Sequence, residues 1–403
     1  MKNRILLSAS FFHALNDATT TVVPMAFPIL YGQGRLITSY SQIGLLSYLG
    51  LLATLLVQYY VVRLSFRLEY QTLMFLSFVG ICISLACVPF ASSFATLLFF
   101  FLFMRVATSF YHPIMIAWVS KSQPAAGLDL AMGIQSGSGN IGVLLAFLSF
   151  GYIAQRWDWK TALLAWSVLG LALGAFGYLA IKGISSKSEV RPSLHFSSWL
   201  KVLGRIRHLI PGFIFGGTGW AVTIYYAPSL LNHEFSVPIG RTGLYLSMWI
   251  ALGTISGYGY GFMSRRFGRR KVYLTSIGVA ALSLAVIGFA PGRAVAVSGL
   301  LLFGVFLLMT YPSIHTFVGS SVPRDDQTQA FSWVSNIQIL SGALVALLAG
   351  LLSDRFGIRA PFLLSALLAA ACFVYYLPPG RLSAAPAAET RGPVPPSIDG
   401  PPE

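Results

Sequence analysis

Charged residues are scarce in this chain of 403 residues: 10% are Asp, Glu, Lys or Arg, whereas 56% are hydrophobic. Soluble domains carry roughly 25% charged residues, so a soluble fold could not cover this much apolar surface. Hydrophobic runs longer than about 18 residues, each able to cross the hydrocarbon layer of a membrane as a helix, follow one another almost end to end. The composition predicts an integral membrane protein and excludes a soluble enzyme.

Cysteine is also rare, and Cys82, Cys87 and Cys372 all fall inside hydrophobic runs. Cysteines in such positions are small packing groups, so neither a disulfide nor a metal site is predicted. The sequence also lacks a Ser-His-acid set and any His/Cys spacing typical of metal ligands. We therefore expect no enzyme activity and no cofactor.

The hydrophobic runs form two sets of six. The first set spans residues 4–31, 40–62, 70–91, 94–119, 128–155 and 160–181, and the second spans 209–232, 241–263, 271–291, 294–319, 328–353 and 359–378. The predicted fold is an all-α membrane protein with twelve transmembrane helices in two six-helix bundles, residues 1–182 and 209–378. Residues 183–208 form the predicted cytoplasmic linker, and the proline-rich residues 379–403 form a predicted disordered cytoplasmic tail.

The basic residues indicate the orientation. Most of the 27 lysines and arginines fall on the side that carries both termini, which the positive-inside bias places in the cytoplasm. We expect a multi-pass protein of the inner (plasma) membrane. The net charge of +15 is then a topology signal. The predicted partner is the lipid bilayer and not nucleic acid, because no basic domain carries the charge.

The two halves repeat at an offset of 199 residues. This offset superimposes Gly44 on Gly243, Leu45 on Leu244, Pro113 on Pro312, Pro124 on Pro323 and Gly151 on Gly350. Parallel six-helix repeats are typical of transporters that hold a solute between two bundles near the middle of the membrane. The repeat therefore predicts a transporter with alternating access, functional as a monomer.

Asp17 and Arg105 are the two charged residues that these spans place well inside the bilayer. An ionisable group there costs several kcal/mol unless it faces a cavity or a partner. His13 and Asn16 share a helical face with Asp17. We interpret Asp17 as a proton-coupling group, with His13 and His112 assisting; the alternatives are a permanent ion pair with Arg105 or a cap on a broken helix.

Arg105 carries a planar guanidinium that matches phosphate, phosphonate or carboxylate. It is the predicted anion clamp for a small-molecule substrate, although an ion pair with Asp17 or bonds to backbone carbonyls would also explain it. Its offset partner is Gly304, and that of Asp17 is Gly216. Coupling is therefore expected in the N-terminal bundle.

Further polar and aromatic residues are predicted to line the substrate cavity. In the N-terminal half these are Asn16, Gln135 and Asn140. In the C-terminal half they are Trp220, Tyr225, Tyr226, Tyr311, His315, Trp333, Asn336 and Gln338. Aromatic residues also gather at membrane interfaces, which is the competing interpretation of each.

The six-plus-six layout is similar to the major facilitator superfamily, and one stretch resembles its cytoplasmic loop motif. The residues of that stretch are Gly261, Arg265, Gly268, Arg269 and Arg270. Arg265 stands where the motif carries Asp, an acid that helps to latch the bundles. A closer copy of glycine, Asp-Arg and glycine occurs at Gly350, Asp354, Arg355 and Gly357. We expect both stretches to be gating loops, with the usual latch weakened or replaced.

Within that superfamily, the N-terminal half resembles the fosmidomycin-resistance group. The similar stretches are Phe12–Asp17, Phe27–Leu30, Ser41–Gly44, Phe110–Pro113 and Gly139–Gly142. The resemblance implies proton-driven export of small molecules, with a phosphonate antibiotic as the group's namesake cargo. It also implies cavity roles for His13, Asn16, Asp17, His112, Gln135 and Asn140.

One departure leaves the direction of transport open. Drug and proton antiporters place a glycine-proline signature in the fifth span, but Val143, Leu144 and Leu145 follow Gly142 here. Proton-coupled efflux of an anionic or amphiphilic solute is the predicted function. The alternatives are a proton-coupled symporter importing an organic anion or metabolite, and a transport-dead receptor or scaffold.

Overall fold

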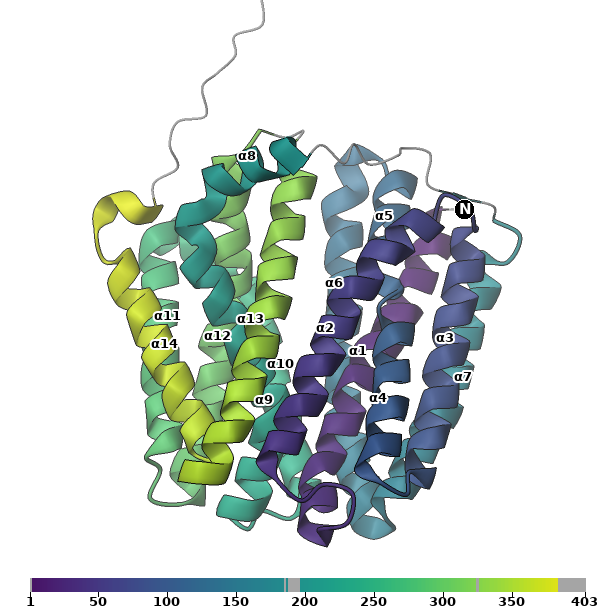
Figure 1. Ribbon diagram of the computed structural model, residues 1–403. Coiled ribbons are helices and arrows are strands. Elements are labelled where there is room, and N and C mark those ends of the chain that lie inside the picture. Colours follow the sequence, from purple (N-terminus) through teal and green to yellow (C-terminus); the bar gives the residue numbers. More distant parts are fainter. Residues whose placement is uncertain (1, 185, 188–195, 324–325, 383–403) are drawn as a thin grey trace, which may run out of the picture.

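Helices alone build the described part of the chain, and they form two bundles side by side (Figure 1). The computed structural model describes residues 2–184, 186–187, 196–323 and 326–382. Residues 185 and 188–195 of the predicted linker, and residues 383–403 of the predicted tail, lie outside the described residues.

The N-terminal bundle contains seven helices and one 3₁₀ turn. They are α1 (Lys2–Gln33), α2 (Tyr40–Leu64), α3 (Tyr70–Cys87), η1 (Val88–Phe90), α4 (Phe94–Thr108), α5 (Tyr111–Ser122), α6 (Ala125–Arg156) and α7 (Trp159–Ile181). Helices α4 and α5 together form the fourth span. The predicted span 94–119 is therefore one crossing made of two helices.

Proline explains the break in the fourth span. Pro113 is the third residue of α5, and the ring of a proline clashes with the carbonyl four residues earlier. That carbonyl belongs to Ser109, and the helix is interrupted at Ser109 and Phe110. The interruption turns Tyr111 and His112 onto a new helix start in the bundle interior.

The C-terminal bundle follows a short connecting helix. The elements are α8 (Phe196–Ile206), η2 (Arg207–Leu209), α9 (Ile210–Ser229), a π-helical turn η3 (Leu230–Glu234), α10 (Ile239–Phe267), α11 (Arg269–Gly288), α12 (Arg293–Ser321), α13 (Gln327–Phe356), α14 (Ala360–Tyr376) and η5 (Pro379–Leu382). Helices α9 to α14 complete the twelve crossings. The predicted fold class is confirmed.

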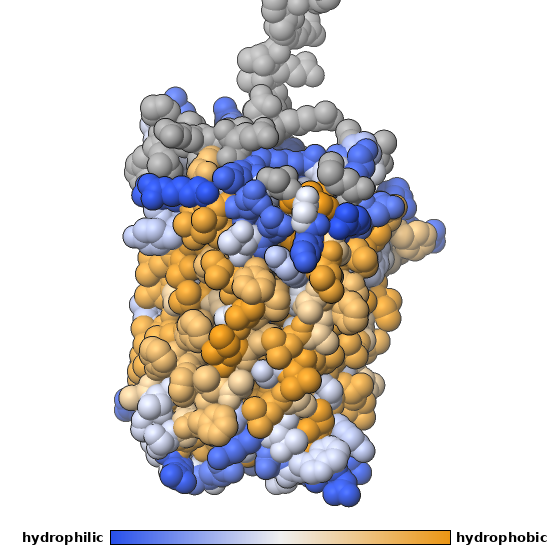
Figure 2. Space-filling view, turned by 90° about the vertical axis from the view of Figure 1, so that its right-hand side faces the viewer, coloured by the Kyte–Doolittle hydropathy of each residue, from blue (hydrophilic) through white to orange (hydrophobic). Residues whose placement is uncertain are grey.

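An apolar belt surrounds the molecule. Figure 2 shows it on one face of the molecule as a broad hydrophobic band between hydrophilic ends. Eight of the described helices are long and apolar enough to cross a membrane by length and composition alone. The polar residues of α1 are tolerated because α5, α6, α7 and α9 pack around it and Asn16 is 3% exposed.

The bundles contact one another chiefly along two helix pairs, α2 with α13 and α6 with α10, and α1 also packs against α9. We call the end that carries both described chain ends and α8 the terminal end, and the opposite end the far end. Figure 1 shows the bundles leaning together at the far end and spreading apart toward the terminal end. Hydrogen bonds from α2 to α13 and from α10 to α6 join them at the far end.

Close packing of α1 on α6 predicts a glycine requirement. A Cβ at Gly142 would lie against the backbone of Ala14, 2.7 Å from its carbonyl carbon, whereas a Cβ at Gly133 on the same helix meets nothing within 4 Å. We expect Gly142→Ala to lower the free energy of unfolding by about 1–3 kcal/mol and Gly133→Ala to leave it unchanged or higher. Denaturant titration in detergent measures both, and equal stabilities would contradict this packing.

Candidate transport site

Asp17 lies at the centre of a polar cluster made by three helices. Its carboxylate is 3.2 Å from Nε2 of His13 and 3.8 Å from Nε2 of His112. The Asn16 side-chain amide donates a hydrogen bond of 3.0 Å to it. The predicted grouping of these four residues is therefore present in the fold: His13, Asn16 and Asp17 come from α1, and His112 comes from the start of α5.

Gln135 and Tyr111 fix the orientation of His13. Nδ1 of His13 lies 2.7 Å from the backbone carbonyl of Gln135, and its ring stacks on Tyr111 with centroids 4.6 Å apart. The Gln135 amide donates to the Tyr111 hydroxyl at 2.6 Å, and that hydroxyl donates to the Ala9 carbonyl at 2.9 Å. The sequence prediction missed Tyr111; its position beside His112 was the available signal.

This arrangement places a proton between His13 and Asp17. Nδ1 of His13 has two partners on Gln135: the backbone carbonyl at 2.7 Å, to which a protonated Nδ1 donates, and the side-chain amide at 3.0 Å, from which an unprotonated Nδ1 accepts. A lone pair and a carboxylate 3.2 Å apart repel one another unless a proton lies between them. The pair therefore shares a proton in each arrangement, either on Nε2 of a neutral or doubly protonated imidazole or on the Asp17 carboxyl group.

The cluster is enclosed on one side and accessible on the other. The side chain of His13 is 8% exposed, whereas those of Asp17 and His112 are 23% and 41% exposed. Gly139 on α6 closes the other side, since a Cβ there would lie 2.5 Å from a carboxylate oxygen of Asp17 and 2.7 Å from Nε2 of His13. The exposed part of the cluster therefore lies on the His112 side.

Arg105 is 5% exposed and lies against α2. Its Nε donates to the Gly50 carbonyl at 3.3 Å, so of the predicted alternatives the backbone carbonyl contact is the one present. Within the described residues no ion pair joins Arg105 to Asp17, whose charged partners are the two histidines. The Arg105 cation also acts electrostatically on His112 and on Tyr225 of α9.

The C-terminal bundle has a matching place without charge. Tyr311 on α12 donates its hydroxyl proton to the Gly216 carbonyl at 3.0 Å, and Nε2 of Gln338 on α13 would lie 3.0 Å from a Cβ at Gly216. Gly216 and Gln338 are the offset partners of Asp17 and Gly139. In the N-terminal bundle, Asp17 of α1 packs on Gly139 of α6. In the C-terminal bundle, the side chain is Gln338 of α13 and the glycine is Gly216 of α9, so the two equivalent helices have exchanged these roles.

The same exchange occurs at Arg105. In the N-terminal bundle Arg105 packs on Gly50. In the C-terminal bundle Trp249, the offset partner of Gly50, packs on Gly304, and its indole would lie 2.5 Å from a Cβ there. The repeat thus keeps a side chain packed on a glycine and changes its chemistry, which leaves the charged side chains of these pairs in the N-terminal bundle.

The fold places several other predicted residues away from this cluster. Tyr226 is fully buried and donates to the Ala346 carbonyl at 2.5 Å. Trp333 donates to the Trp199 carbonyl of α8, at the terminal end. His315 is exposed and packs edge-on against Phe331. Three predicted residues are half-buried and carry no side-chain hydrogen bond in the described ranges: Asn140, Trp220 and Asn336.

The two predicted gating stretches lie at opposite ends. Gly268 ends α10 with φ of 86°, a left-handed conformation that favours glycine, and Arg270 donates to the Leu377 carbonyl within the same bundle. The same stretch at the terminal end also contains Gly261, Arg265 and Arg269. Gly350, Asp354 and Arg355 lie at the far end, where Asp354 contacts α2.

The fold also brings together a metal-binding type of donor set that sequence spacing did not reveal. The ligand atoms of His13, Asp17 and His112 lie within 4.8 Å of one another, and two imidazoles with one carboxylate suit a transition metal. Two ligands of one ion at about 2.1 Å lie at most about 4.2 Å apart. The 3.2 Å contact between His13 and Asp17 already has the length of a hydrogen bond. In this structure these two side chains are therefore hydrogen-bonded to each other.

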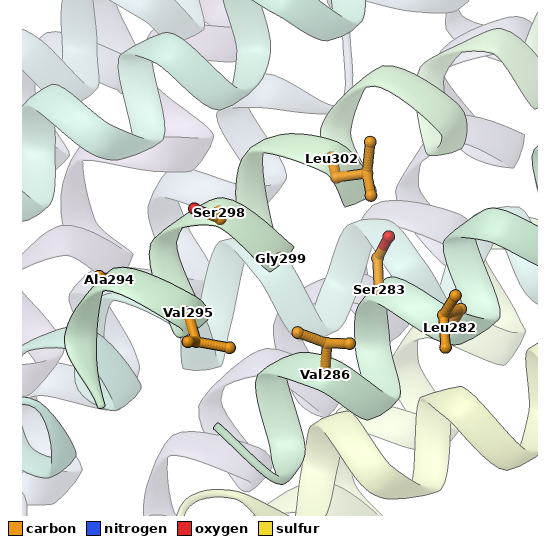
Figure 3. A pocket seen from close by; sticks show the side chains of 8 residues that line it. All are labelled: Leu282, Ser283, Val286, Ala294, Val295, Ser298, Gly299 and Leu302. Atoms are coloured by element: carbon orange, nitrogen blue, oxygen red, sulfur yellow. The ribbon is translucent and has the colours of Figure 1, made fainter. Parts of the chain in front are cut away.

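An apolar groove of about 340 Å³ lies between α11 and α12 (Figure 3). The side chains that line it are Leu282, Ser283, Val286, Ala294, Val295, Ser298, Gly299 and Leu302. None of these can hold a proton or bind an anion by charge. The groove is therefore not the coupling site.

Two six-helix bundles with a polar cluster in the interior define a polytopic membrane transporter. A family model described as Major Facilitator Superfamily matches residues 6–258 and 209–398. These matches cover nearly the whole chain, so the chain belongs to the major facilitator superfamily.

Two relatives are similar in sequence. The uncharacterized MFS-type transporter YfnC of Bacillus subtilis (strain 168) is 23% identical over 367 residues, 88% of this chain and 87% of YfnC. The multidrug resistance protein MdtG of Yersinia enterocolitica serotype O:8 is 30% identical over 137 residues, 33% of this chain and 32% of MdtG.

Solved structures share the fold at low identity. A bacterial homolog of the human lysosomal transporter Spinster, in an inward-facing and unoccupied conformation, has a TM-score of 0.78 at 16% identity and covers 93% of this chain and 96% of its own. The nucleoside transporter NupG has a TM-score of 0.77 at 13% identity, with 93% and 98% covered. These likenesses show the fold alone.

The hydroxyl of Tyr111 gives a testable requirement. Tyr111→Phe removes the 2.6 Å acceptor of the Gln135 amide and one of the hydrogen bonds of the Ala9 carbonyl, and the loss of a buried hydrogen bond costs about 0.5–1.5 kcal/mol. We expect a lower thermal midpoint in detergent, whereas Tyr152→Phe, at a tyrosine that is 65% exposed, leaves it unchanged. Equal midpoints for the two variants would contradict the network.

Proposed function

We propose that this transporter couples the movement of a small anionic or amphiphilic solute to protons and works as an efflux antiporter of the inner membrane. The observation that carries the proposal is the hydrogen-bond-length contact between His13 Nε2 and Asp17, which brings together two titratable groups that share a proton and can exchange it. Both termini are cytoplasmic in this proposal, because the terminal end is rich in Lys and Arg. The far end then faces outward.

The proton site and the anion site communicate through His112. Its imidazole is 3.8 Å from the Asp17 carboxylate and within the electrostatic field of Arg105. A proton arriving at the cluster adds positive charge near Arg105 and strengthens the binding of an anion. A proton leaving the cluster restores the negative charge of Asp17 and weakens the binding of the anion. This positive linkage loads the proton and the anion together and therefore supports the symport candidate. Antiport requires in addition that the carrier reorients only with the proton or only with the solute bound.

Arg105 binds the anionic group of the solute in this mechanism. One N–H of its guanidinium bonds to Gly50, and its other N–H groups have no hydrogen-bond partner among the described residues. Two buried donors of the C-terminal bundle, Nε2 of Gln338 and Nε1 of Trp249, also lack a partner there. Such donors favour a solute rich in acceptor oxygens, as a phosphonate or carboxylate is.

Efflux is favoured by the resemblance of the N-terminal half to the fosmidomycin-resistance group and by the similarity of a third of the chain to a protein named for multidrug resistance. The sequence Val143-Leu144-Leu145 after Gly142 supports a second candidate, a proton symporter that imports an organic anion. Both candidates use the same Asp17 and Arg105.

Reconstitution tests the function directly. The purified chain is placed in liposomes, a proton gradient of either sign is imposed, and charged and neutral solutes including phosphonates are screened for flux. Antiport predicts that solute moves against the proton flow, and symport predicts that it moves with it. Solute fluxes that ignore the gradient in both directions would overturn proton coupling.

Loss of the Asp17 charge separates coupling from binding. We expect Asp17→Asn to reduce gradient-driven accumulation to background and to spare downhill solute exchange, since an amide cannot take up and release the proton. Asp158→Asn, which changes an exposed helix cap on α7, is the matched control and keeps accumulation. Accumulation against a gradient by the Asp17 variant would exclude the coupling role.

The geometry of Arg105 predicts a selective loss for anions. Arg105→Lys keeps the charge but not the planar fork, and hydrogen bonds to charged groups contribute about 1.5–3 kcal/mol. We expect the apparent KM for an anionic solute to rise about tenfold, which is about 1.4 kcal/mol. Arg63→Lys, at an arginine that bonds to exposed Tyr59, is the control. An unchanged KM in the Arg105 variant would count against the clamp.

A further inference from the structure

The start of α2 receives hydrogen bonds from the opposite bundle. Ser39 caps this helix locally by accepting from the Gln42 backbone N–H. The two preceding N–H groups, of Tyr40 and Ser41, donate instead to the Asp354 carboxylate of α13, at 2.7 and 2.9 Å. The Ser41 hydroxyl donates to the same carboxylate. A carboxylate at a helix N-terminus also interacts favourably with the helix dipole.

The repeat places a second cap at the symmetry-related position. The offset of 199 residues pairs Asp354 with Gln155 and Ser41 with Gly240. Oε1 of Gln155 at the end of α6 accepts the Gly240 backbone N–H at 2.8 Å. The N-cap of α10 is Pro238, which makes no side-chain cap of its own. Each long interface helix therefore begins under a side chain of the other bundle.

Glycines allow both helix pairs to approach closely enough for these caps. A Cβ at Gly44 would lie 2.9 Å from the Ala346 carbonyl oxygen, and one at its offset partner Gly243 would lie against the Phe147 carbonyl. A Cβ at Gly350 would lie 3.0 Å from Cα of Ser41, and one at Gly151 would lie 2.7 Å from the Ile239 carbonyl oxygen. The repeated glycines are thus the contact points between the bundles.

We propose that Asp354 and Gln155 are a pair of latches that hold the far end closed by capping α2 and α10 across the bundle interface. This inference rests on the proposed alternating access, in which the far end must open once per cycle. The Asp354 latch is the stronger one, because hydrogen bonds to a charged acceptor are roughly twice as strong as neutral ones and because it caps two N–H groups instead of one.

The position of the latches makes them reversible. Asp354 is exposed, so water replaces its hydrogen bonds when the bundles part, and the helix start is not left with buried unpaired donors. Ser39 stays with α2 on opening and keeps one N–H satisfied. In the superfamily motif, the acid that latches the bundles belongs to a loop at the terminal end. In this chain the proposal assigns that role to Asp354, the acid of the Gly350 to Gly357 stretch, at the far end.

Distance measurements between the bundles at the far end test the proposal. Spin labels are attached at Arg35→Cys and Arg293→Cys, two exposed positions of different bundles, with half-buried Cys87 replaced by alanine. We expect Asp354→Ala to raise the ratio of long to short distances about three- to tenfold, in line with the loss of a helix cap. Gln155→Ala raises it less, and the double variant approaches the product of the two.

Glu234→Gln is the matched control, because Glu234 pairs with Arg359 at the same end but within one bundle. An Asp354→Ala distribution equal to that of the control and of the unmodified chain would overturn the latch. Ser41→Ala, which removes only the hydroxyl contact, gives a smaller shift and guards against misfolding of the Asp354 variant. The measurement uses neither solute nor gradient, so it can fail or succeed independently of the proton-coupling assay.

Discussion

The contact between His13 and Asp17 is the interaction on which the rest of the interior depends. In a bilayer, polar groups must be satisfied within the protein, and an ionisable group away from water is costly without a partner. The chain meets this demand on α1 by holding the imidazole between the Gln135 carbonyl and the Asp17 carboxylate. Tyr111 completes the support, because its hydroxyl connects Gln135 to α1. The cost of the charge is thereby offset locally by groups that the fold holds in contact.

The repeat explains why such a site occurs once. At each of two places, a large side chain on one helix packs on a glycine of another, and the second bundle reverses which helix provides the glycine. Asp17 on Gly139 becomes Gln338 on Gly216, and Arg105 on Gly50 becomes Trp249 on Gly304. The packing of a side chain on a glycine is repeated, whereas the charge is not. Among the described residues, the duplicated fold has therefore placed charged side chains in one bundle and uncharged side chains at the equivalent places of the other.

Much of this architecture could be predicted from the sequence, because hydrophobic length and glycine and proline positions report directly on helices. The spans, the repeat and the grouping of His13, Asn16 and Asp17 follow from spacing alone. The interruption at Ser109 and Phe110 was signalled by Pro113 but not predicted. The partner of Arg105 could not be predicted, because a guanidinium bonds equally well to a carboxylate or a carbonyl. The place of Tyr111 and the caps by Asp354 and Gln155 depend on which helices meet in space, and local periodicity contains no such information.

Direct counting of protons during solute movement tests the central claim. In liposomes with the membrane potential clamped and a pH-sensitive dye inside, addition of a transported solute is predicted to move protons at a fixed ratio to solute in the unmodified chain. The ratio falls to zero when His13 and Asp17 can no longer share a proton, as in His13→Phe. Solute that accumulates against its gradient with no proton movement would contradict the account.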